Sequence, residues 1–263
     1  MSKITPDDLK KKLDYHYRYF DKSKISPDPL EFLHRYNNYH DIEISGIISS
    51  IFAYGNIKQI MSTLEKIHSI MNHNPYEFVR KYKIEKGIED FVRIKHRFYC
   101  SSDIANLFKG LNKIYSEYNS LQEFFKIEDS SSKFGIKNLI ASFSKRIIEL
   151  IIVNDSVSHG IKFMFPDPYK GSACKRMNLF LRWMVRKDEL DFGLWNKIPA
   201  SKLIIPVDTH IAKICKELKL TKLKNVSWKM AEEITENLKK FDPDDPVKYD
   251  FAICHIGMRG LEF

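Results

Sequence analysis

Apolar residues recur along most of the chain at intervals of three and four, the spacing of one face of an α-helix. No stretch alternates apolar and polar residues as a half-buried strand would. The pattern predicts an all-α protein, in which the longest loop covers residues 154–170. Four helices are expected to begin at Pro6, Asp41, Asn56 and Pro75. A fifth is expected to be capped by Asp103, and a sixth to cover residues 134–152.

The segment after Gly171 is amphipathic and carries a lysine at its start. Gly171 and Ser172 are residue types that end a turn and cap a helix. One face is apolar, and a second face holds Lys175, Asn178, Leu179, Arg182 and Arg186. We therefore expect a helix with a basic face and with Lys175 in its first turn. An ordinary solvated basic face is the alternative explanation of the same pattern.

Lys175 is also a candidate nucleophile. An amine attacks only when it is neutral, and both a helix N-terminus and a neighbouring cation disfavour the ammonium form. Lys175 has the expected helix start below it and Arg176 beside it.

A second candidate lies in the run Pro206–His210. Asp208 precedes Ile211, Ile214, Cys215 and Leu218, which form a helical stripe. Asp208 is therefore expected to be the N-cap of this helix. A carboxylate in such a turn can also face a functional site, so a cap alone and a cap that takes part in chemistry both remain open.

Charge and cysteine spacing narrow the functional classes. The 263 residues include 43 Lys and Arg against 34 Asp and Glu, a net charge of +9, which favours an anionic partner such as nucleic acid. The four cysteines, Cys100, Cys174, Cys215 and Cys254, are too far apart for a zinc or iron–sulfur motif. We expect no metal and no cofactor. No apolar stretch suits a membrane span or a secretion signal, so a cytoplasmic protein is expected.

The run Ile205–Ile211 resembles the catalytic-aspartate segment of the helix-hairpin-helix DNA glycosylase superfamily, which includes endonuclease III and the 8-oxoguanine glycosylases. In that superfamily a lysine follows a glycine-containing hairpin, and Lys175 after Gly171 resembles it. Asp208 follows Lys175 by 33 residues, an interval similar to that of the archaeal-type 8-oxoguanine glycosylases. This interval is longer than that of endonuclease III, and the segment 188–195 fills the difference. The chain also resembles a largely uncharacterised bacterial family of this superfamily.

The resemblance rests on residues 166–260, where the superfamily's Leu-Pro-Gly-Val-Gly hairpin is replaced by Gly171–Lys175. It implies one glycosylase-like unit of two helical lobes, roughly residues 45–160 and residues 1–44 with 161–263, and a cleft between them. The implied reaction is excision of oxidised guanine from duplex DNA by a nucleoid-associated monomer that also nicks the strand. Lys175 would be the nucleophile and Asp208 its carboxylate partner.

The same resemblance suggests residues around the target base and the phosphate backbone. The candidates for the base are Asp250, Trp183, Trp195, Phe251 and Gln59, and those for DNA are Gly171, Arg176, Arg182, Arg186 and His210. For most of them a second interpretation stays open: the aromatic residues as core, Asp250 as a surface acid and His210 as an ordinary helix-start residue. A catalytically silent nucleic-acid-binding protein of the same fold is the alternative function, and a structural helical protein is a third.

Overall fold

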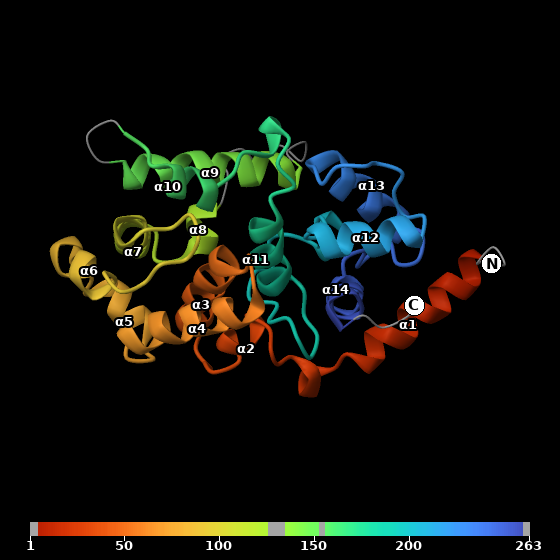
Figure 1. Cartoon of the computed structure of the whole chain (residues 1–263), viewed down its shortest axis with the longest axis horizontal. Helices are drawn as coiled ribbons and strands as arrows, with labels where there is room; N and C mark the ends of the chain where they lie inside the picture. Colours follow the sequence, from red (N-terminus) through yellow and green to blue (C-terminus); the bar gives the residue numbers. More distant parts are fainter. Residues whose placement is uncertain (1–4, 126–134, 153–155, 260–263) are drawn as a thin grey trace. The chain divides into compact units, whose positions relative to one another are not determined.

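The prediction of an all-α protein is confirmed. The computed structural model describes residues 5–125, 135–152 and 156–259. Every regular element in these ranges is a helix, and no β-strand is present in them (Figure 1). Two isolated bridges, His96 with Tyr99 and Lys187 with Phe192, close tight turns.

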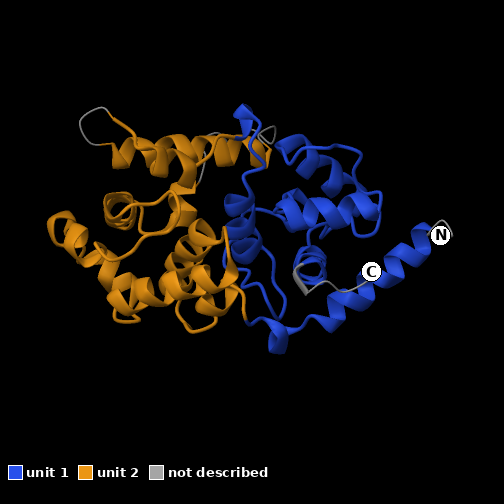
Figure 2. Cartoon of the chain, in the orientation of Figure 1, with its two compact units in different colours: residues 1–26, 168–263 blue, residues 27–167 orange. Residues whose placement is uncertain are grey.

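The chain folds as two compact units (Figure 2). Unit 1 comprises residues 1–26 and 168–263, and unit 2 comprises residues 27–167. The sequence predicted boundaries between the lobes at residues 44/45 and 160/161, whereas the units meet at residues 26/27 and 167/168. As a result, α2 and the start of α3 belong to unit 2 rather than to the lobe that includes the N-terminus. Lys175 and Asp208 both lie in unit 1, whereas Gln59 lies in unit 2.

Unit 2 is built around one helix, α7. This 17-residue helix buries nine residues and packs against α5, α6, α8, α9 and α10. The helices of this unit are α2 (Leu30–Leu33), α3 (Tyr39–Phe52), α4 (Ile57–Ile70), α5 (Pro75–Arg80), α6 (Ile84–Asp90), α7 (Ser101–Glu117), α8 (Leu121–Phe125), α9 (Ile136–Ile151) and α10 (His159–Met164). Burial of this apolar surface supplies the main favourable free energy of folding.

Helix α3 is buried over nearly its whole circumference and packs against α2, α4 and α5. It contains a fully buried acid, Glu43. The Glu43 carboxylate accepts hydrogen bonds from the Tyr115 hydroxyl (2.6 Å) and from the backbone N–H groups of Leu121 (2.9 Å) and Gln122 (3.1 Å). These donors satisfy the buried carboxylate, which in turn binds N–H groups at the start of α8 that have no partner within the helix.

Unit 1 contains α1 (Pro6–Tyr19), α11 (Lys175–Val185), α12 (Thr209–Glu217), α13 (Trp228–Leu238) and α14 (Asp250–Arg259), with short 3₁₀ turns at Lys22–Lys24, Pro168–Lys170 and Ala200–Lys202. Helix α14 packs against both α1 and α12. This packing brings the beginning of α14 close to the C-terminal half of α1 and to the helix that Asp208 caps.

Three helix boundaries differ from the sequence-based expectation. Helix α3 begins at Tyr39 because Asn38, rather than Asp41, is its N-cap. Helix α7 begins after Cys100, and Asp103 lies at the third helical position, where its carboxylate accepts the Cys100 N–H. Helix α10 falls inside the expected loop 154–170, of which residues 154 and 155 lie outside the described part.

In the described ranges, none of the helices has the length and apolar content that crossing a membrane requires.

Candidate active site

The turn before Lys175 is held in an unusual backbone conformation. Gly171 has a φ of +87° and Cys174 a φ of +47°, a left-handed conformation that costs a residue with a Cβ about 1–2 kcal/mol. Several hydrogen bonds hold the turn: the Asn178 side-chain amide donates to the Ala173 carbonyl (3.0 Å), the Trp228 N–H to the Gly171 carbonyl (3.1 Å), and the Cys174 N–H to the Ser172 hydroxyl (3.2 Å). The chain therefore enters α11 in one defined direction, and the first residue of the helix is Lys175.

Asp208 is the N-cap of α12, as predicted. Its Oδ1 accepts hydrogen bonds from the backbone N–H groups of His210 and Ile211, both 2.9 Å long. Its Oδ2 lies 3.4 Å from Lys175 Nζ. One carboxylate therefore performs two tasks, with one oxygen capping a helix and the other facing the amine.

The Lys175–Asp208 pair is open to solvent only in part, with 27% of the lysine side chain and 25% of the aspartate side chain exposed. Burial raises the pKa of Asp208, but the Lys175 charge and the Ile211 N–H lower it more, so the net pKa is below the usual 3.8. Asp208 therefore stays ionised at neutral and mildly acidic pH. The site combines an amine with a partly exposed carboxylate that is ionised at neutral pH.

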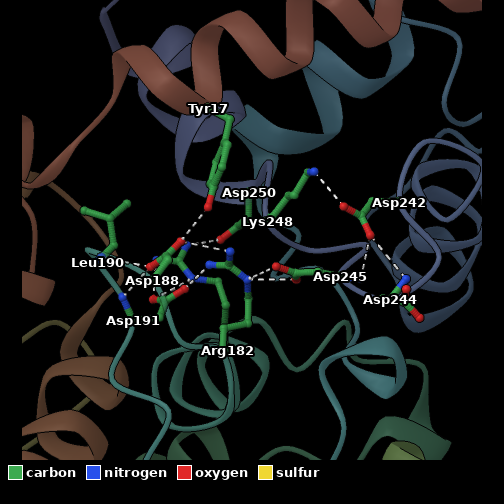
Figure 3. Close-up of polar contacts among 11 residues, drawn as sticks. Tyr17, Arg182, Asp188, Leu190, Asp191, Asp242, Asp244, Asp245, Lys248 and Asp250 are labelled. Carbon is green, nitrogen blue, oxygen red and sulfur yellow. Dashed lines mark hydrogen bonds and ion pairs between the residues drawn. The ribbon is translucent and has the colours of Figure 1, made fainter.

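Arg182 of α11 and Arg186, the C-cap residue of this helix, lie in a buried ion network. Figure 3 shows Arg182 and the carboxylates of this network. Arg182 is 2% exposed; it donates to Asp191 Oδ1 through Nε (3.2 Å) and Nη2 (3.1 Å), and to Asp250 Oδ2 through Nη1 (2.5 Å). Asp191 forms a second ion pair with Arg186, so one buried carboxylate joins both guanidinium groups.

Arg186 is 3% exposed and is surrounded by acids. Besides Asp191 it binds Asp245 through Nε (2.8 Å) and Asp188 through Nη2 (2.9 Å). The Tyr17 hydroxyl from α1 donates to the same Asp188 oxygen (3.1 Å). The acids raise the pKa values of both arginines despite burial, so both guanidinium groups remain charged.

These contacts correct the expectation of an exposed basic face on α11. Arg182 and Arg186 are not available to DNA phosphates, because carboxylates of their own unit occupy their donors. Arg176 is also buried, with 7% exposure. On this face Asn178, Arg182 and Arg186 are buried, whereas Lys175 at its start stays partly exposed.

Asp250 begins α14 and is 3% exposed, which excludes the interpretation as a surface acid. Burial raises its pKa to about 6, against the lowering effect of Arg182; Asp208 adds to the rise, and Lys175 opposes it. Lys175 and Asp208 therefore lie near enough to Asp250 for their charges to influence its pKa. Sequence reasoning grouped Asp250 with the target base, but its partner in this structure is Arg182.

Comparison with known families gives one match. A family described as "Protein of unknown function (DUF2400)" matches residues 28–259. This chain belongs to the DUF2400 family. No curated protein and no solved structure matches it. The matched range includes α2 to α14, and therefore the Lys175–Asp208 pair and the arginines of the network, but not α1.

The aromatic residues expected to stack on a base lie in the core of this DUF2400 member. Trp183 and Trp195 are each 1% exposed, and Phe251 is 5% exposed. Trp195 packs edge-on against Phe180 (5.2 Å between ring centroids), and Phe251 packs against Phe20 of the same unit. The second interpretation, that these residues are core, is the correct one, and base stacking by them is not supported.

The other predicted residues are exposed but differ in their relation to the site. His210 lies in the first turn of α12, and its N–H binds Asp208. Gly171 lies in the turn before Lys175, and a side chain there would meet nothing within 4 Å. Gln59 lies in the first turn of α4 in unit 2. Of the predicted set, unit 1 therefore joins Lys175, Asp208, His210 and Gly171 in neighbouring turns.

Sequence reasoning missed the acids of the network, Asp188, Asp191 and Asp245. The segment 188–195, which is expected only to lengthen the interval between Lys175 and Asp208, carries a signal for two of these acids, Asp188 and Asp191. After α11 the chain folds back on the helix, with Phe192 N–H bound to the Trp183 carbonyl (2.9 Å) and Trp195 N–H to the Met184 carbonyl (2.8 Å). Acids in such a return turn lie beside the last turn of the helix and can pair with its arginines.

Replacing Arg182 tests the network. We expect Arg182→Met to lower the free energy of unfolding by about 3–5 kcal/mol, because Asp191 and Asp250 would lose a buried counter-ion. Urea unfolding measures this loss. Arg18→Met on the exposed side of α1 in the same unit is the matched control and should unfold like wild type. An Arg182→Met protein as stable as this control would contradict the buried network.

Proposed function

We propose that this protein is a DNA base-excision glycosylase that uses Lys175 as nucleophile and Asp208 as its carboxylate partner. The observation that carries the proposal is the 3.4 Å contact between Lys175 Nζ and Asp208 Oδ2. The two residues are 33 positions apart in the sequence, and each lies at the start of its own helix. In a partly exposed site, an amine can attack a sugar carbon and form an imine, and a neighbouring carboxylate can assist this reaction.

The proposed reaction needs no protein group beyond these two. After losing its proton to solvent water, the Lys175 amine attacks the anomeric carbon of the target nucleotide. The bond from that carbon to the base nitrogen breaks, and the base leaves with the bonding electrons and takes up a proton. Opening of the sugar ring then leaves an imine between Lys175 and the sugar, and elimination of the 3′ phosphate would nick the strand. The target base must be turned out of the duplex, because its sugar carbon cannot be reached inside the stack.

The low pKa of Asp208 favours one of its two conceivable roles. A carboxylate that holds protons weakly is a poor general base, but it keeps its full negative charge beside a developing cation. We therefore assign Asp208 mainly to stabilising the positive charge that forms on the sugar as the base departs. Its second oxygen is fixed by two backbone N–H groups, so the charge is held in place before the reaction.

The distribution of charge supports a nucleic-acid partner. Unit 1 carries 25 Lys and Arg against 17 Asp and Glu, whereas unit 2 carries 18 against 17. The excess therefore lies in the unit that contains the Lys175–Asp208 pair. Because the buried network joins two arginines to four aspartates, the remaining residues of unit 1 are more positive still. Such a surface attracts a polyanion.

The lesion is proposed from the resemblance, which points to oxidised guanine. The test is a panel of duplex oligonucleotides, each with one defined lesion, including 8-oxoguanine, incubated with the protein and examined for released base. Release from the 8-oxoguanine duplex, and not from the undamaged duplex, is the expected result. DNA binding without base release from any lesion would refute the glycosylase and favour a silent nucleic-acid-binding protein.

A further inference from the structure

The end of α12 and its connection to α13 carry a group of exposed lysines. We call the segment Lys216–Lys224 the lysine loop. Its four lysines are all exposed: Lys216, Lys219, Lys222 and Lys224. In the described part of the chain, none of them forms an ion pair with a carboxylate. The loop contains one acid, Glu217, and therefore presents a net positive charge to solvent.

The lysine loop is held by specific contacts. Lys219 has a φ of +60°, and the following N–H, of Leu220, donates to the Cys215 carbonyl (2.8 Å), which ends α12. Glu233 of α13 accepts hydrogen bonds from the Thr221 hydroxyl and the Lys222 N–H. The Lys216 ammonium donates to the Lys224 carbonyl (2.7 Å) and draws the two ends of the loop together. Glu233 of α13 is thus already engaged by the loop backbone and the threonine.

The lysine loop is connected to the candidate active site at both ends. Helix α12 leads from the Asp208 cap to the loop, and its nine residues span about 14 Å at 1.5 Å per residue. Beyond the loop, α13 begins at Trp228, whose N–H binds the Gly171 carbonyl in the turn before Lys175. The distance from the loop to the Lys175–Asp208 pair is therefore set by one short helix and one direct hydrogen bond.

We propose that the lysine loop binds the phosphate backbone of duplex DNA at a position remote from the reacting nucleotide. The position of that nucleotide at Lys175–Asp208 rests on the proposed function, whereas the phosphate contact rests on the loop alone. Phosphates of one strand follow each other at about 3.4 Å along the duplex axis, so 14 Å corresponds to about four base steps. Lysine ammonium groups suit such a contact because they bind phosphates without reading the sequence.

This surface takes the place of the face of α11, where Arg182 and Arg186 are committed to internal ion pairs. A duplex bound through the loop releases counter-ions, so its affinity falls with salt, with a slope of about 0.9 for each phosphate neutralised. We expect the triple variant Lys219→Gln, Lys222→Gln and Lys224→Gln to reduce that slope by about 2 to 3. Affinity for a long undamaged duplex should fall at every salt concentration.

The control is a triple variant with the same change in net charge, in exposed lysines of unit 2: Lys66→Gln, Lys83→Gln and Lys86→Gln. Its salt slope should stay within about 0.5 of the wild-type slope, since the control weakens only the long-range attraction between the protein's net charge and DNA. A second measurement uses a duplex with fewer than about four base pairs on each side of its centre. On this short duplex the lysine-loop variant and wild type should bind alike, because the duplex does not reach the loop.

The outcomes separate this inference from the proposed function. A lysine-loop variant that keeps the wild-type slope on the long duplex overturns the phosphate contact even if bases are released. A variant that differs from wild type equally on the short duplex overturns the remote position of that contact. If the lysine-loop variant has a reduced salt slope but wild type releases no base from any lesion, the phosphate contact is supported and the glycosylase function is refuted. Circular dichroism of both triple variants should match wild type, since the substituted side chains are exposed and form no ion pairs with other described residues.

Discussion

Lys175→Gln should abolish covalent trapping of DNA. If Lys175 forms an imine with the sugar, borohydride reduces it to a stable protein–DNA adduct that denaturing electrophoresis detects on an 8-oxoguanine duplex. A glutamine amide cannot form this imine, so the adduct should fall by at least about 10³-fold. The fold should survive, because a partly exposed ion pair contributes about 1 kcal/mol or less.

Two other lysines of unit 1 serve as controls for this experiment. Lys187 is exposed just beyond the end of α11, and Lys248 resembles Lys175 in being partly buried and paired with an aspartate, Asp242, at 2.6 Å. Lys187→Gln and Lys248→Gln should both trap DNA as wild type does. If Lys175→Gln still traps while one of the controls does not, the nucleophile is that other lysine, and the assignment of the turn at Gly171 is wrong.

The helices of this chain could be predicted from the sequence where they are amphipathic and long. Helices α1, α4 and α9 follow directly from apolar residues at intervals of three and four. Helix α10 was missed because six residues make too short a stripe, and its cap, Ser158, stood in a segment with two prolines farther on. The start of α7 was misplaced because a cysteine caps it, which residue preference does not suggest.

The pairing of Lys175 with Asp208 could be predicted only through the resemblance, because spacing shows which residues begin helices but not which helix starts meet. The arginines of α11 illustrate the same limit. Helical periodicity places Arg182 and Arg186 on one face, yet whether that face meets water or protein depends on segments elsewhere in the chain. Here the return turn with Asp191 and the distant Asp250 cover it. A helical wheel contains no information on such partners.

Asp208→Asn should separate the two tasks of this residue. Asparagine caps a helix about as well as aspartate, so the free energy of unfolding should change by less than about 1 kcal/mol. The charge beside the sugar is lost, however, and base release under single-turnover conditions should fall by about 10²- to 10³-fold, as expected for removal of one electrostatic stabiliser. Base release is measured by chromatography of the free base from an 8-oxoguanine duplex.

Unit 1 provides a close match to Asp208 for this test. Asp242 also accepts backbone N–H groups with one oxygen and binds a lysine, Lys248, with the other, and its pKa is likewise lowered overall against the effect of burial. Asp242→Asn therefore removes the same charge from the same kind of turn, away from Lys175, and should leave base release unchanged. Equal losses in both variants would mean that the effect comes from the stability or charge of unit 1. Full activity in a folded Asp208→Asn protein would leave Asp208 with the helix cap as its only role.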